Sequence, residues 1–162
     1  MKKLLFLIFP FLLVSCSIAN APTREYHAHA GFQVFIDNKL QDFSGVGNMY
    51  FKPCGLVPDE IKTLKDKVHL HDQIGDVLHI HDATISWKDA MDSIGVVTGS
   101  GATFYVDGKE DNLLLTEKIT EFESASIFIG KNTDIEKKVA GRVTKERMVE
   151  IENKKAENCG KE

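Results

Sequence analysis

The 162-residue sequence has no excess of basic residues, no closely spaced cysteine pair and no long apolar run. Lysine and arginine number 20 against 24 aspartate and glutamate residues, and the formal net charge is −4 at pH 7. A chain of this charge has no electrostatic footprint for a nucleic-acid backbone, so that class of partner is excluded. With 43% hydrophobic and 27% charged residues, the composition is that of a globular chain, and the length suits one domain.

The apolar segment near the start, Leu4 to Val14, is too short to cross a membrane. Its residues, at about 1.5 Å each in a helix, span far less than the roughly 30 Å of a hydrocarbon core. Because the segment follows Lys2-Lys3, the pattern predicts a signal peptide over residues 1–15 and therefore export. The segment runs into Leu13-Val14-Ser15-Cys16, which resembles the lipobox of bacterial lipoproteins. This resemblance implies that Cys16 is acylated and anchors the chain to a membrane, with residues 16–24 as a tether. Cleavage after Ala21 is the alternative.

Three cysteines are present. If Cys16 carries lipid, Cys54 and Cys159 remain as an even pair in a compartment where disulfides persist. They do not form a Cys-x-x-Cys motif, so a thioredoxin-like redox function is not indicated. We expect a disulfide that ties the C-terminal tail to the domain, and two free thiols are the alternative.

Periodicity and turn residues predict an α+β fold with a mainly antiparallel or mixed sheet, one central helix and a helical C-terminal tail. A β-rich domain is expected over residues 25–130 and the tail over 131–162. The expected strands cover residues 25–36, 40–43, 68–71, 77–81, 103–106 and 126–130. The expected helices cover residues 58–67 and 87–95, followed by two charged helices that are capped by Thr133 and Thr144 and separated by Gly141. Tight turns are expected at Asp37-Asn38-Lys39 and at Asp107-Gly108.

The order of elements from Val77 to Gly130 resembles the β-grasp order of small sulfur-carrier and ubiquitin-like proteins. The resemblance is carried by a strand, the helix that starts at Trp87, a strand that ends at Val106-Asp107-Gly108, and the strand Ile127-Phe128-Ile129. A sulfur carrier needs a C-terminal Gly-Gly for activation. Here Lys131 follows Gly130, so the resemblance implies the fold and not that activity.

All six histidines occur in His-x-His pairs. On a strand, residues i and i+2 point to the same face and lie about 6.5 Å apart, close enough to share a metal ion. The residue between each pair is apolar and would face the core, so the histidines are expected on the opposite face. The pairs are His27-Ala28-His29, His69-Leu70-His71 and His79-Ile80-His81.

A hairpin that is symmetric about Gly75 would place His69 opposite His81 and His71 opposite His79. A shift of two residues would keep the shared face, whereas a shift of one would abolish it. We expect the strand that carries His27 and His29 to lie alongside. Four imidazolium cations so close together would repel, so the neutral, metal-binding form is favoured.

All-imidazole ligation suits Cu(II), Zn(II) or Ni(II), with Cu(II) or Zn(II) the expected cofactor. Three aspartates near the strand ends are candidates to accept hydrogen bonds from the distal ring nitrogens, as supporting groups of a metal site often do. The alternative for them is turn chemistry and solubility. They are Asp72, Asp76 and Asp82.

With these histidine pairs, the chain resembles a family of small exported bacterial and archaeal proteins. The family shares a Tyr-His-x-His strand, here Tyr26 to His29, and a paired segment matching His69 to His81. The later elements and a late cysteine like Cys159 follow in the same order. Members are sometimes labelled disulfide isomerases, but this sequence contains no Cys-x-x-Cys motif. The family is essentially uncharacterised, so the resemblance implies a shared fold and site without an activity.

The sequence therefore predicts an exported, lipid-anchored protein that captures, buffers or transfers a transition metal. A metalloenzyme with three histidine ligands and an open position is the first alternative. The second is a pH-responsive histidine surface that binds another envelope protein.

Overall fold

The computed structural model describes residues 26–51 and 63–154. The predicted signal peptide, the tether, and the candidate residues Cys16, Cys54 and Cys159 lie outside the described residues, as does the first part of the helix expected from residue 58.

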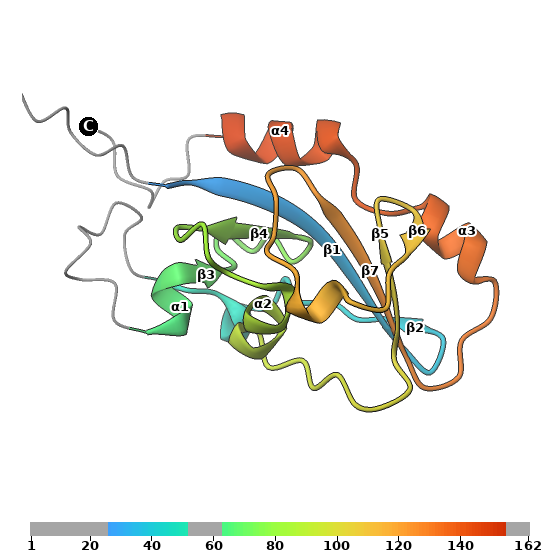
Figure 1. The fold of residues 1–162 in the computed structure, drawn as a ribbon. Helices are drawn as coiled ribbons and strands as arrows, with labels where there is room; N and C mark the ends of the chain where they lie inside the picture. Colours follow the sequence, from blue (N-terminus) through green and yellow to red (C-terminus); the bar gives the residue numbers. More distant parts are fainter. Residues whose placement is uncertain (1–25, 52–62, 155–162) are drawn as a thin grey trace, which may run out of the picture.

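One mixed sheet organises the described chain (Figure 1). Its strands are β1 (Ala28–Ile36), β2 (Lys39–Leu40), β3 (Val68–His69), β4 (Val77–Ile80), β5 (Thr103–Val106), β6 (Lys109–Glu110) and β7 (Ser124–Ile129). They follow the order β3-β4-β1-β7-β5-β6, and β2 pairs with the end of β1. β1 and β7 are parallel, whereas the other pairs are antiparallel. The expected α+β class is confirmed.

The centre of the sheet follows the order of elements that the sequence predicts. β4, the helix α2 (Trp87–Ser93), β5 and β7 follow one another along the chain as expected. In the sheet, β1 lies between β4 and β7 and supplies the parallel central pair. Between β1 and β4 the chain inserts β2, the short helix η1 (Val46–Asn48), α1 (Leu64–Lys67) and β3. β3 extends the sheet beyond β4 and ends at His69, and His71 follows two residues later.

The larger hydrophobic core lies between the sheet and α2. Alternate residues of β1, from Ala28 to Val34, point to this side and pack with Trp87 and Met91. Ser86 caps α2 through a capping box with Asp89, as the sequence predicts. Because side chains alternate along β1, one face of the strand packs in this core, and the histidines lie on the opposite face.

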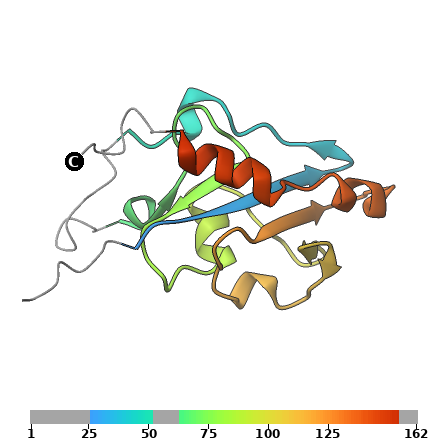
Figure 2. The same cartoon turned by 90° about the horizontal axis from the view of Figure 1, so that it is seen from above.

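The opposite face of the sheet is covered by the C-terminal helices α3 (Ile135–Ala140) and α4 (Lys145–Asn153). Figures 1 and 2 show α4 along β1, and Figure 1 shows α3 at the far end of the sheet, close to β5 and β6. Thr144 caps α4 as expected, but the N-cap of α3 is Asp134 and not Thr133. Asp134 has a left-handed backbone, with φ of 52°, which moves the start of α3 by one residue. No helix in the described ranges is long and apolar enough to span a membrane.

The two predicted tight turns form. Asp37 and Asn38 both have positive φ between β1 and β2, and Asp107 and Gly108 both have positive φ between β5 and β6. Asn, Asp and Gly tolerate this backbone better than other residues. The return strand β2 is shorter than expected, since only Lys39 and Leu40 pair with β1.

Gly31 is the point of closest approach between β1 and the C-terminal segment. A Cβ atom there would lie 2.6 Å from Cβ of Val143 and 3.4 Å from Sδ of Met148. Gly31→Ala is therefore expected to lower the free energy of unfolding by about 1–3 kcal/mol, because the segment must move away from the sheet. Gly47→Ala is the matched control, since nothing lies within 4 Å of its added Cβ. Urea unfolding of both variants measures the difference, and equal stabilities would contradict this packing.

Candidate metal centre

Strand pairing brings the three His-x-His pairs together. His29 lies opposite His79 in the β1–β4 pair, and His69 lies opposite His79 in the β3–β4 pair. β4 is thus the middle strand of three, with histidines on both neighbours. The expectation that the strand of His27 and His29 lies alongside the hairpin is confirmed.

The hairpin register differs from the symmetric one. His69 pairs with His79 and not with His81, a shift of two residues. The cause is the turn, because Asp72 and Gln73 both have positive φ and reverse the chain directly after His71. Gly75 serves another purpose: its added Cβ would lie 2.4 Å from the backbone nitrogen of Ser44, so glycine permits close backbone packing. The shift is even, so the histidines keep their shared face.

Most of the histidine side chains are more buried than side chains on a solvent-facing side of a sheet would be. His29 and His79 are 1% and 2% exposed, and His69, His71 and His81 are also buried. Only His27 is exposed. The six histidines are not part of the apolar core on the α2 side of the sheet. Instead, the rings bury one another, with centroid separations of 4.3 Å for His29–His79 and 5.0 Å for His27–His81.

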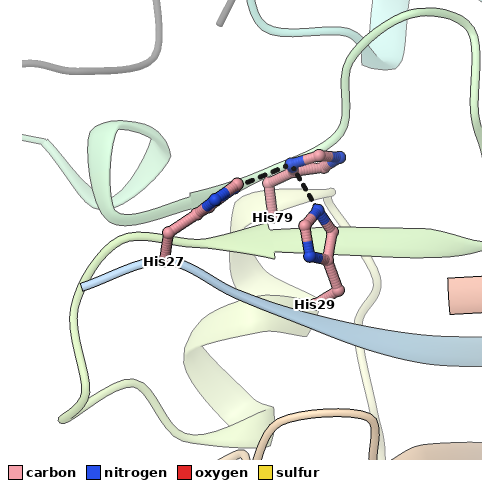
Figure 3. Close-up of side chains that lie close together, drawn as sticks. All are labelled: His27, His29 and His79. Atoms are coloured by element: carbon pink, nitrogen blue, oxygen red, sulfur yellow. Dashed lines mark hydrogen bonds between the residues drawn. The ribbon is translucent and has the colours of Figure 1, made fainter. Parts of the chain in front are cut away.

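Three ring nitrogens lie at the spacing of ligands on one metal ion (Figure 3). Nδ1 of His79 lies 3.1 Å from Nε2 of His29 and 3.4 Å from Nε2 of His27. The three ligand atoms all lie within 4.8 Å of one another, and the group contains no carboxylate. Two imidazoles on a tetrahedral ion with bonds of about 2.0–2.1 Å have nitrogens roughly 3.3 Å apart. These three side chains could hold a metal ion.

Two other histidines have their Nδ1 atoms fixed by acceptors. Nδ1 of His69 donates to the carbonyl oxygen of Lys65 at 2.8 Å. Nδ1 of His71 donates to Oδ2 of Asp72 at 2.7 Å. Both Nδ1 atoms therefore carry a proton. A carbonyl or carboxylate behind a histidine ring is the usual support of a metal ligand.

Asp76 and Asp82 make their hydrogen bonds elsewhere. Asp76 pairs with Arg147 of α4 at 3.3 Å. Asp82 pairs with Lys67 at 2.9 Å and accepts hydrogen bonds from Thr84. Of the three candidate aspartates, Asp72 is the one that the structure joins to a histidine ring.

A tyrosine and a buried aspartate support His69, and sequence reasoning missed both. The ring of Tyr50 packs on His69 with centroids 4.7 Å apart, and its hydroxyl donates to Asp66. Asp66, only 2% exposed, forms a capping box with Thr63 at the start of α1. This box sets the position of α1 and hence of the Lys65 carbonyl. Thr63-x-x-Asp66 is the sequence signal that could have found it.

Burial and mutual repulsion lower the pKa of five of the six histidines and so favour their neutral form. Burial, together with the neighbouring histidines, lowers the pKa of His29 and of His81 to about 4. The pKa of His69 falls to about 3 for the same two reasons, and that of His79 lies well below its ordinary value. Burial also lowers the pKa of His27, which nearby Glu121 partly offsets. Neutral imidazole is the form that binds metal.

Fold and site together define a small α+β domain with a largely buried cluster of six histidines at one end of its sheet. No protein-family model matches the chain, and no curated protein or solved structure matches it either.

The lowered pKa values make the metal-free protein sensitive to acid. Well above pH 6.5, His29 and His81 are neutral in both the folded and the unfolded chain. As the pH falls from 6.5 to about 4, only the unfolded chain takes up protons at His29 and His81, so stability is lost through this window. The loss is about 1.4 kcal/mol per pH unit for each such histidine.

Urea unfolding of the chelator-treated protein at pH 7, 6 and 5 measures this slope. His81→Gln removes one titrating ring and should give a shallower slope. A free energy of unfolding that does not change between pH 7 and pH 5 would contradict the argument.

Proposed function

We propose that this is an exported, lipid-anchored protein that captures, buffers or transfers a transition metal ion, Cu(II) or Zn(II). The observation that carries the proposal is the spacing of the His27, His29 and His79 ring nitrogens, two of which lie 3.1 and 3.4 Å from the third. Scattered surface histidines have no reason to share this spacing.

The donor set supports the choice of metal. Imidazole nitrogens suit Cu(II), Zn(II) and Ni(II), whereas Ca(II) and Mg(II) prefer oxygen ligands, and no carboxylate belongs to the group. The rings are also neutral near pH 7, so an ion does not have to displace protons from imidazolium groups before it binds.

Export and anchoring rest on the sequence before the described residues. The apolar run that ends at Cys16 and the resemblance to a family of small exported proteins support a place in the cell envelope. The exposure of His27 at the edge of an otherwise buried cluster supports an exchange role, because an ion could enter and leave at this ring.

A metalloenzyme is the second candidate, and the number of ligands favours it. The metal group contains three histidines, which leaves a tetrahedral ion one position for water or substrate. The coordination of the bound ion separates the two functions: a fourth imidazole indicates storage or transfer, and a water indicates an enzyme. A surface that senses pH near neutrality is disfavoured, since the pKa of His29 and of His81 is about 4.

Metal binding by the full-length protein in detergent tests the proposal. We expect Cu(II) or Zn(II) to bind with submicromolar affinity in a competition titration. His29→Gln or His79→Gln should weaken binding at least tenfold, because each removes one of three ligands. Gln41→Ala, directly after β2 and outside the histidine cluster, is the control and should bind as the wild type does. A wild-type protein that binds none of Cu(II), Zn(II) and Ni(II) would refute the proposal.

A further inference from the structure

A cavity of about 390 Å³ lies at the start of α4, and none of the six histidines lines it. Its walls come from the start of β7, the turn between β5 and β6, and the segment that joins α3 to α4. Figure 1 shows this segment passing beside the β5–β6 turn, and Arg142 of the segment lies against Gly108 of the turn. A cavity of this size can hold a small ligand.

Ser124, the first residue of β7, offers this cavity a buried hydroxyl. Its backbone is paired with Asp107, because its N–H donates to Oδ1 of Asp107 at 3.0 Å and its C=O accepts from the Asp107 N–H at 2.9 Å. Ala125 and Ile127 pack in the core on the α2 side, so alternation turns the Ser124 side chain toward the C-terminal helices and the cavity. Ser124 is only 2% exposed, and its Oγ has no hydrogen-bond partner within residues 26–51 and 63–154. Buried hydroxyls normally have a partner, so this one calls for a ligand.

Arg142 brings a positive charge to the same cavity. Its half-buried side chain lies over the β5–β6 turn, where a Cβ atom on Gly108 would be 3.4 Å from Nη1. The guanidinium donates one long hydrogen bond, of 3.5 Å, to the carbonyl oxygen of Val139. It forms no ion pair with any residue that the structure describes. A guanidinium with most of its donors unused matches the two oxygens of a carboxylate.

The start of α4 adds further positive charge. Lys145 is the first residue of this nine-residue helix and lines the cavity, with its Nζ 5.0 Å from the centre of the Phe122 ring. Like Arg142, it has no ion pair in the described part of the chain. The N-terminal end of a helix also carries a partial positive charge, because its first N–H groups lack partners within the helix.

Two carboxylates line the cavity as well, and both already accept hydrogen bonds. Asp107 accepts from the N–H of Ser124. Hydrogen bonds from its own backbone N–H and from the Thr144 hydroxyl lower the pKa of Glu146. Neither carboxylate forms an ion pair with Arg142 or Lys145. The two cations therefore remain available to an anionic group of a ligand.

The remaining walls of the cavity are apolar. They are formed by Phe122, Ala140, Val143 and Met148. An inorganic anion would leave these walls without a contact. A ligand with a negatively charged head and a short aliphatic chain matches both the polar and the apolar part of the cavity.

We propose that this cavity binds a small monocarboxylate, whose head is held by Arg142, Lys145 and the Ser124 hydroxyl. The aliphatic chain of the ligand contacts the apolar walls. This site is separate from the metal centre and adds a second binding function to the domain.

Titration calorimetry of the metal-free, full-length protein in an uncharged detergent tests the proposal, with pentanoate as the probe. Metal-free protein is used so that the carboxylate cannot bind to an ion at the histidines. We expect one pentanoate per chain at pH 7. Pentanamide has the same size without the charge and should bind roughly tenfold more weakly, or less tightly still. Equal binding of the two compounds, or no saturable binding of pentanoate at millimolar concentrations, would refute the proposal.

Arg142→Gln and Arg147→Gln form a matched pair. Arg147 is also an arginine near the start of α4, but it pairs with Asp76 and lines a different cavity. We expect Arg142→Gln to weaken pentanoate binding about tenfold or more, because it removes the charged fork that holds the head. Arg147→Gln should bind as the wild type does. Equal losses in the two variants would contradict the position given to the carboxylate.

Ser124→Ala separates ligand binding from a structural role. The hydroxyl has no partner in the described ranges, so its removal should not lower the free energy of unfolding without ligand. Pentanoate binding should fall by about threefold or more, since a hydrogen bond to the carboxylate is lost. An unchanged affinity, or a loss of stability without ligand, would contradict the role given to Ser124.

His29→Gln keeps this test apart from the metal site. It should lose metal affinity and bind pentanoate as the wild type does, because His29 does not line the cavity. A wild-type protein that binds Cu(II) or Zn(II) but not pentanoate would refute the carboxylate site and leave the proposed function standing.

Discussion

The pairing of β1, β4 and β3 is the constraint on which the site depends. Side chains alternate along each strand, so a histidine pair at i and i+2 can join a neighbouring pair only if the register is even. The pairing of His29 and His69 with His79 meets this condition from both sides. The same alternation sends Ala28 and Ile80 into the core, so packing on the α2 side stabilises the register that assembles the histidines.

A buried set of imidazoles opposes folding while it is metal-free. Desolvation and mutual repulsion disfavour the charged rings. Nδ1 of His29, which has no hydrogen-bond partner among residues 26–51 and 63–154, has also lost its hydrogen bond to water. The apolar packing on both sides of the sheet must offset this cost. A metal ion that binds only the folded chain returns free energy to it, so metal binding and stability are coupled. Burial that would be a defect in an ordinary core is the expected condition of a metal site.

The sequence predicted much of the site, and the features that it did not predict have physical causes. The spacing of His27 and His29 and the apolar residue between them predicted the shared face. The two-residue shift of the hairpin was not predictable, because it depends on the left-handed backbone of Asp72 and Gln73. The burial of the rings and the contact of Tyr50 with His69 arise between segments distant in the chain. Local pattern predicts which residues share a face, but it does not predict what covers them.

The unequal exposure of the ligands bears on how an ion would be exchanged. Of the three histidines that could hold a metal ion, His27 is exposed, while His29 and His79 are buried and lie on paired strands. An ion can therefore lose one ligand at the edge without any change in the sheet, and an incoming donor can take that position. The rings of His69 and His71 are buried and their Nδ1 atoms donate to fixed acceptors, so these rings have less freedom to move than the ring of His27. The edge at His27 is therefore the side of the cluster at which a ligand exchange would disturb the fold least.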